Sequence, residues 1–288
     1  MSDDSGGDDT GGGGSGGAGG GSQISTPDFS VDEYLISVEI KRGERKNRFL
    51  VITNEDNIVL NFVVELEGLE DFVSLAESSF SLDPGKSKSV ILSFFVDEDA
   101  EINIHTGNIL VKALGAEKKV GVVLEIIEKS SLFDLKIRLL FDVLSKSEKL
   151  DSIIQITDVA DRGKVSVLLE YFIKDFDDFE IKLAEEIIEV DGTLEIERAF
   201  PIPETLRTGE EYVFYVKLTY QNSVATSANT FKLIDVIRIF NILLYIIVLI
   251  IVFVLLVWLF LSSRKKKDKR VVLEKGAEKE NKAEILQV

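Results

Sequence analysis

The stretch "GKVSVLLEYFIKD", residues 163–175, decides the fold class. Its apolar side chains recur at every second position: Val165, Val167, Leu169, Tyr171 and Ile173. Successive side chains of a β-strand point to opposite faces of a sheet, so this period of two predicts a strand with one buried face. The stretches "KSVILSFFVDE" (88–98) and "EEYVFYVKLTYQN" (210–222) show the same pattern. Each apolar face needs a second sheet to cover it, which favours a β-sandwich.

The spacing of turn signals extends this interpretation to most of the chain. Turns rich in Gly, Asp and Asn recur between the apolar runs, and helical segments of ten or more residues are missing between them. The strands divide into two sets, each close to the ~100 residues typical of an immunoglobulin-like sandwich. "SLDPGKSKSVILSF" and "TLRTGEEYVFYVKL" form a weak internal repeat that supports a duplication. We predict one sandwich over 24–129 and a second over 130–236.

The two ends of the chain differ from this β region. Residues 1–22 contain 11 glycines and four aspartates, so residues 1–23 are predicted to form a disordered linker. From Ile239 to Ser263, 25 positions contain no charged residue. As a helix they would measure roughly 37 Å, enough to cross a hydrocarbon core of about 30 Å. We therefore predict a single transmembrane helix over 239–263, with Tyr245 and Trp258 as anchors at the two membrane interfaces.

A basic cluster follows the apolar run and predicts its orientation. Its residues are Arg264, Lys265, Lys266, Lys267, Lys269 and Arg270. The flank before the run offers only Lys232 and Arg238, so the positive-inside rule places the tail, residues 264–288, in the cytoplasm. The sandwiches are then extracellular. The cluster is consistent with a plain stop-transfer signal, and contact with anionic lipid headgroups is a further role open to it. The first 22 residues lack the basic and apolar regions of a signal peptide. A signal outside this sequence, or a tail-anchored protein with a cytosolic body, are both open explanations.

Composition argues against several kinds of chemistry. The chain has no cysteine and one histidine, His105, so thiolate chemistry and histidine-rich metal sites are excluded. The net charge is −17, which opposes nucleic-acid binding. A cluster of carboxylates lies in "DFDDFE": Asp175, Asp177, Asp178 and Glu180. It lacks the glycine and the final bidentate glutamate of a calcium loop, so a solvated hairpin loop is the expected structure. We expect no enzyme activity, no cofactor and no metal site.

Several stretches resemble a known family. "ITNEDNIVLNFVVELEGLEDFVSL", "FSLDPGKSKSVILSFFVDEDAE" and "HTGNILVKALGAEKKVGVVLEI" resemble the Ig-like modules of archaeal and bacterial cell-surface proteins. "GKVSVLLEYFIKDFDDFEI" and "EYVFYVKLTYQNSVATSANTF" are similar to a partner repeat that precedes a transmembrane anchor. The resemblance covers about residues 24–262 and implies tandem Ig-like sandwiches on a cell envelope. Its motifs are turns and strands, which say little about function.

These observations predict an all-β protein of two tandem immunoglobulin-like β-sandwiches followed by one transmembrane α-helix. The expected function is that of a non-enzymatic, single-pass surface protein in adhesion, envelope organisation or protein–protein interaction. Stacked sandwiches would hold the N-terminal linker some tens of Å from the membrane. The alternative is an accessory subunit of a larger membrane complex, recognised through its helix and tail. Expected partners are membrane lipids, other surface or membrane proteins, or a second copy of the chain.

Overall fold

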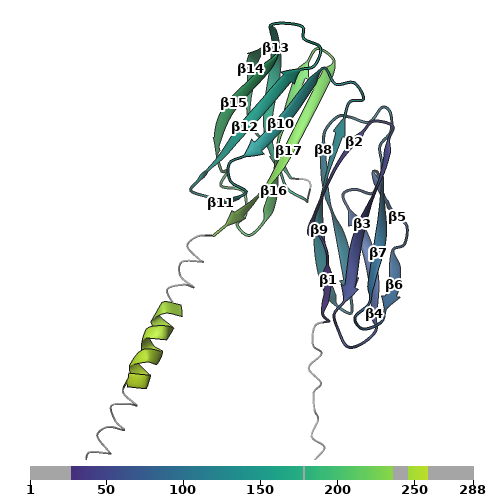
Figure 1. Cartoon of the computed structure of the whole chain (residues 1–288), viewed down its shortest axis with the longest axis vertical. Helices are drawn as coiled ribbons and strands as arrows, with labels where there is room; N and C mark the ends of the chain where they lie inside the picture. The colour runs from purple at the N-terminus through teal and green to yellow at the C-terminus, as the bar shows by residue number, and fades with distance from the viewer. Residues whose placement is uncertain (1–26, 178, 236–245, 259–288) are drawn as a thin grey trace, which may run out of the picture.

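A computed structural model describes residues 27–177, 179–235 and 246–258 (Figure 1). These ranges contain seventeen strands and a helix over 246–258. The predicted linker, Tyr245, the basic cluster and the cytoplasmic tail lie outside the described residues. Across the part that is described, no helix is both long and apolar enough to cross a bilayer.

The first sandwich consists of two sheets. One has the order β1 (Phe29–Val31), β3 (Arg45–Asn54), β7 (Ser87–Phe95) and β5 (Val73–Leu75). The other has the order β2 (Leu35–Lys41), β9 (Ala116–Ile127), β8 (Ile104–Ala113), β4 (Leu60–Glu67) and β6 (Ser79–Leu82). The strands pair antiparallel except β2, which runs parallel to β9. The chain therefore starts in one sheet and crosses to the edge of the other.

The second sandwich repeats this arrangement. Its smaller sheet has the order β10 (Phe133–Leu139), β12 (Lys149–Asp158) and β15 (Thr193–Pro201). Its larger sheet has the order β11 (Val143–Ser145), β17 (Ser223–Ile234), β16 (Glu211–Tyr220), β13 (Val165–Lys174) and β14 (Glu180–Val190). Here β11 is the strand that runs parallel, and it pairs with β17. The chain again starts in one sheet and crosses to the other.

This topology is immunoglobulin-like. In the letter notation of such domains, β1-β3-β7-β5 is the A-B-E-D sheet, and β9-β8-β4 is the G-F-C sheet. The prediction of an all-β, immunoglobulin-like fold is confirmed. The internal repeat was matched wrongly, because β7 corresponds in topology to β15, whereas β16 corresponds to β8. A glycine turn before an alternating strand is a general feature of hairpins, so it does not identify equivalent strands.

Each sandwich has its own apolar core between its two sheets. The first core includes Val90, Leu92, Phe94 and Val96, and the second includes Val167, Leu169, Tyr171 and Ile173. These are the faces that the period of two predicts. Burial of each such side chain contributes about 1.5–3 kcal/mol, and the two cores are the main source of stability.

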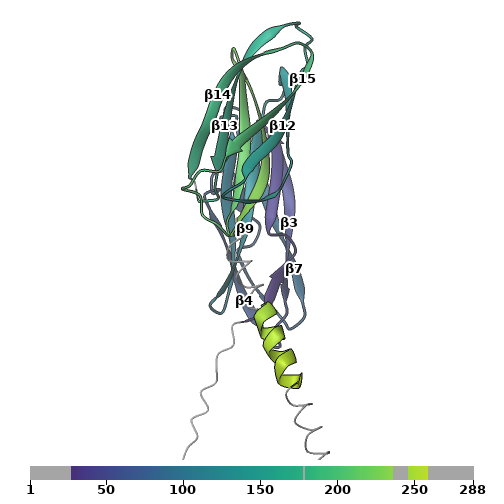
Figure 2. The same ribbon diagram turned by 90° about the vertical axis from the view of Figure 1, so that its left-hand side faces the viewer.

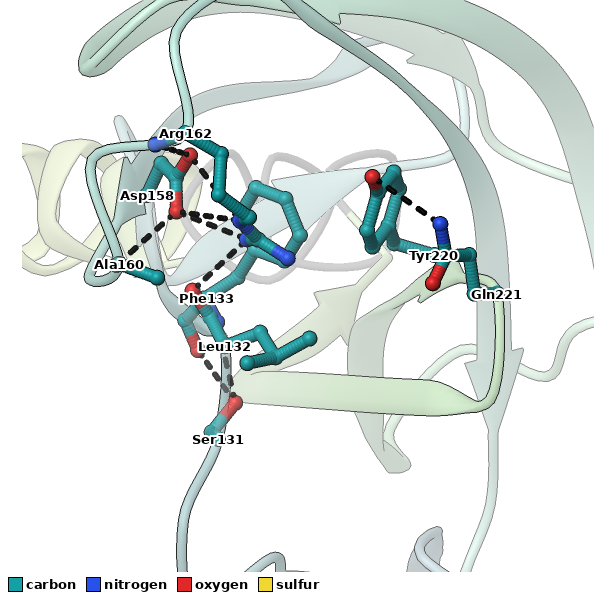
Figure 3. Close-up of polar contacts among 8 residues, drawn as sticks. All are labelled: Ser131, Leu132, Phe133, Asp158, Ala160, Arg162, Tyr220 and Gln221. Atoms are coloured by element: carbon teal, nitrogen blue, oxygen red, sulfur yellow. Dashed lines mark hydrogen bonds and ion pairs between the residues drawn. The ribbon is translucent and has the colours of Figure 1, made fainter.

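An ion pair stabilises one end of the second sandwich (Figure 3). This end is next to the joint, residues 128–132, which connects β9 of the first sandwich to β10 of the second. The side chain of Asp158 is fully buried and accepts a hydrogen bond of 2.7 Å from Arg162 Nη2. The guanidinium lies 4.5 Å from the ring centre of Phe133 and 4.7 Å from that of Tyr220. The hydrogen bonds from Arg162 lower the pKa of Asp158. Arg162 Nη2 also donates to the Leu132 carbonyl at 3.2 Å, so the cluster holds the joint in place.

Candidate functional site: the contact between the two sandwiches

The two sandwiches lie side by side and are offset along their long axes (Figures 1 and 2). The two sandwiches are therefore not stacked end to end, contrary to the expectation from the sequence. The sheet that contains β8 and β9 faces the sheet that contains β16 and β17. A third apolar cluster forms between them, separate from the two cores, from Ile104, Val123, Val213 and Tyr215. Strands β8 and β16 are consequently buried on both faces over most of their length.

Aromatic rings from the second sandwich cover this cluster. The rings of Phe172 and Tyr215 stack with centroids 4.8 Å apart and an interplanar angle of 11°. Phe176 lies against Gly121 of β9, where an added Cβ atom would come within 2.9 Å of the ring. Glycine at this position allows the close approach, because any side chain would have to displace the ring. The local sequence of β9 thus sets how close the sandwiches come.

Hydrogen bonds from the first sandwich hold the loop between β13 and β14. Thr106 Oγ1 donates to the Asp175 carbonyl at 2.7 Å, and Asn108 Nδ2 donates to the Phe176 carbonyl at 2.8 Å. Both donors are buried residues of β8. Docking removes water from these two donors, and because a buried polar group without a partner is costly, the two bonds offset that loss.

The acidic cluster "DFDDFE" lies in this loop, and its carboxylates have separate roles. Asp175 Oδ1 accepts hydrogen bonds of 2.8 Å from the backbone N–H groups of Asp177 and Phe179, which shape the loop. Asp177 pairs with Lys119 of the first sandwich at 2.8 Å. Glu180 accepts a hydrogen bond of 2.7 Å from Tyr215. Asp178 lies outside the described residues. Within the described ranges, no group of three or more carboxylates or imidazoles is placed to hold a metal ion.

A cleft of about 530 Å³ opens where the loop meets both sandwiches. Tyr34 and Lys119 line it from the first sandwich, and Phe179, Arg207 and Lys232 line it from the second. Exposed rings alternate here with charges of both signs. Such a surface suits polar and aromatic side chains of another protein better than a small apolar ligand.

One carboxyl group in the contact is unusually placed. Glu125 of β9 accepts a hydrogen bond of 3.0 Å from Thr226 Oγ1 of β17. Glu39 is its neighbour on the parallel strand β2. Burial, and to a lesser degree the charge of Glu39, raise the pKa of Glu125 to about 7. At neutral pH the contact between the sandwiches therefore contains a carboxyl group close to its titration midpoint.

Of the other residues singled out from the sequence, Trp258 and His105 are described, and neither belongs to the apolar cluster between the sandwiches. Trp258 is in the helix and is 64% exposed, whereas Tyr245 and all six basic residues lie outside the described ranges. His105 is the second residue of β8 and packs against the ring of Phe72 at 4.4 Å. The contact between the sandwiches was missed. The signal for it was the continuous apolar run "YVFYV" (212–216), which is typical of a strand buried on both faces.

Comparisons with known proteins found similar solved structures but no family. No family model matches the chain, and no curated protein matches it. Among solved structures, a protein of unknown function from Porphyromonas gingivalis is similar at 14% identity with a TM-score of 0.39, over 71% of this chain and 99% of that one. The Escherichia coli chaperone DraB is similar at 11% identity and a TM-score of 0.31, over 71% and 96%.

A single domain is similar as well. PapD-like domain 7 of human CEP192 matches at 10% identity and a TM-score of 0.31, over 36% of this chain and 88% of that one. At these identities and TM-scores, the likenesses carry no conclusion about this chain.

Proposed function

We propose that this chain is a non-enzymatic, single-pass membrane protein whose two joined sandwiches lie outside the cell and bind other surface or membrane proteins. One observation carries the proposal: the helix over 246–258 is apolar at every position, and each of its side chains is between 41% and 70% exposed. Globular proteins rarely leave a continuous apolar surface of this kind in water.

The bilayer is the environment that fits this helix. Leu, Ile, Phe and Val at the centre of a spanning helix each favour insertion by roughly 0.3–0.6 kcal/mol. The described helix is the middle of the uncharged run from Ile239 to Ser263, and the basic cluster follows directly. The same cluster supports a cytoplasmic tail and contact with anionic lipids.

The joined sandwiches supply binding surfaces of two kinds. The first is the cleft between them, with its exposed rings and mixed charges. The second is an open sheet edge, since β14 pairs with β13 alone in the described part of the chain. An edge of eleven residues leaves one row of backbone groups free to pair with an added strand. Adhesion and envelope organisation both require surfaces of this type.

Site-specific labelling tests the topology, because the chain has no native cysteine. Ser78→Cys places a thiol at an exposed position between β5 and β6, and Ala283→Cys places one in the tail. A membrane-impermeant maleimide added to intact cells is expected to label position 78 and not position 283, and permeabilised cells should label at both. Labelling at position 283 alone would sink the surface-protein proposal in favour of a cytosolic body.

A helix exchange distinguishes an anchor from a recognition element. Residues 239–263 are replaced by an unrelated apolar helix of equal length, and partners are compared by cross-linking in intact cells. Partner association should survive the exchange if the sandwiches bind. Loss of association with retained membrane insertion would instead identify an accessory subunit recognised through its helix.

A further inference from the structure

An exposed apolar loop runs from the end of β10 into the first residue of β11, Val143, in the second sandwich. Leu140, Phe141 and Val143 are 45%, 60% and 47% exposed. The loop is held in place by backbone hydrogen bonds: Leu140 N–H donates to the Asp151 carbonyl at 2.9 Å, and Lys232 N–H donates to the Asp142 carbonyl at 2.8 Å. Three large apolar side chains are thus presented to the outside by an ordered segment.

The loop lies beside the point where the chain leaves the second sandwich. Val143 pairs with Lys232, and Ser145 pairs with Ile234, the last residue of β17. The uncharged run begins at Ile239, five residues further along the chain. Five residues span at most about 18 Å even when fully extended. The exposed loop is therefore tethered close to the start of the segment assigned to the membrane.

The size of the apolar surface favours lipid over a protein partner. A stable protein interface buries about 800 Å² on each side. Fully burying a large aromatic side chain accounts for roughly 150–250 Å², so one half-exposed phenylalanine and two aliphatic side chains fall well short of that area. A few apolar side chains are sufficient to enter the interfacial layer of a bilayer when the protein is already anchored beside it.

We propose that Leu140, Phe141 and Val143 insert into the outer interfacial layer of the membrane that the helix crosses. This inference rests on the proposed membrane anchor. The second sandwich is then attached to the bilayer at two points, the helix and the loop. Two attachments restrict its tilt, and the contact with the first sandwich passes this restriction to the whole two-sandwich body.

Fluorescence quenching by lipids tests the proposal in the full chain. Phe141→Cys carries an environment-sensitive fluorophore in protein reconstituted into phosphatidylcholine vesicles that contain headgroup-spin-labelled lipid. Val159→Cys is the matched control, because Val159 is also apolar and exposed, at 63%. It follows the last residue of β12, whereas the loop lies beside the start of that strand. We expect quenching several-fold stronger at position 141 than at position 159.

A fluorophore at a second position tests the insertion without replacing a side chain of the loop by the label. Ser147→Cys lies in the exposed turn between β11 and β12. Its quenching should fall when Leu140→Ser and Phe141→Ser are introduced together, since the loop then loses its affinity for the interface.

Three results would contradict the proposed insertion of the loop. Equal, weak quenching at positions 141 and 159 in vesicles that carry the protein on flotation overturns the loop insertion and leaves the membrane anchor standing. A blue-shifted emission at position 141 without quenching also overturns it, because protein, such as a second copy of the chain, then covers the loop. Failure of the protein to float with the vesicles overturns both the insertion and the anchor.

Discussion

We predict that ionisation of Glu125, in the contact between the sandwiches, makes the free energy of unfolding depend on pH. Its pKa is raised from 4.5 to about 7 in the folded chain, chiefly by burial. A carboxyl group with a raised pKa opposes folding when it is ionised. The penalty is absent below the unfolded pKa, grows as the pH rises from about 4.5 to 7, and is complete above that range.

The size of the effect follows from the shift. One pKa unit corresponds to about 1.4 kcal/mol, so a shift of this size costs roughly 3 kcal/mol at pH 8. Glu125→Gln removes the ionisation and keeps an oxygen that accepts the hydrogen bond from Thr226. The variant should therefore match the wild type in free energy of unfolding at pH 4.5. It should be more stable by up to about 3 kcal/mol at pH 8.

Denaturant unfolding of the full chain in detergent, followed by the circular dichroism of the strands, measures this difference. Only the difference between variant and wild type is compared, because fifty acidic residues give the whole protein its own pH dependence. Glu195→Gln, an exposed position on β15, is the matched control and should show no such pH-dependent gain. A gain for Glu125→Gln that is equal at pH 4.5 and pH 8 would refute the argument, since a buried ionisation cannot produce it.

Three further substitutions test the packing. Gly107→Ala should destabilise the first sandwich by about 1–3 kcal/mol in denaturant unfolding, because its Cβ atom would lie 2.4 Å from the Glu67 carbonyl oxygen. Arg162→Ala should lower the free energy of unfolding by about 2–3 kcal/mol, because it leaves Asp158 buried without its cation. Arg162→Lys should recover only part of this loss. Equal stability of the wild type and both variants would contradict the role of the ion pair. Gly121→Ala should loosen the contact between the sandwiches without unfolding either one, seen as faster hydrogen exchange in the loop over 175–179, and unchanged exchange there would argue against close packing at this position.

The two cores could be predicted from the sequence because they obey a local rule. A strand with one buried face must place apolar residues at alternate positions, and Val90, Leu92 and Phe94 do so within a single short stretch. Residues that belong to one face can be identified without knowledge of what covers them. For this reason the sequence alone predicts the all-β, immunoglobulin-like fold.

The contact between the sandwiches could not be predicted in the same way. Its apolar cluster joins Ile104 and Val123 to Val213 and Tyr215, which lie about a hundred residues apart in the chain. The alternating pattern assigns these side chains to the outer faces of their strands. An apolar residue on an outer face does not show which other part of the chain covers it. Asn108 is equally ambiguous, since its role depends on the Phe176 carbonyl that reaches it. Such a contact is defined by tertiary packing and has only a faint local signature.

The side-by-side arrangement also bears on the proposed membrane anchor. Strand β1 begins, and strand β17 ends, in the lower part of the two-sandwich body as it is drawn in Figure 1. A stack placed end to end would instead separate these two points by the length of both domains. Because the contact is held by a buried apolar cluster and by hydrogen bonds from Thr106 and Asn108, the first sandwich stays folded back along the second. In the proposed surface protein, the first strand therefore starts toward the end of the body from which the chain leaves for the helix, instead of at the far end of an end-to-end stack.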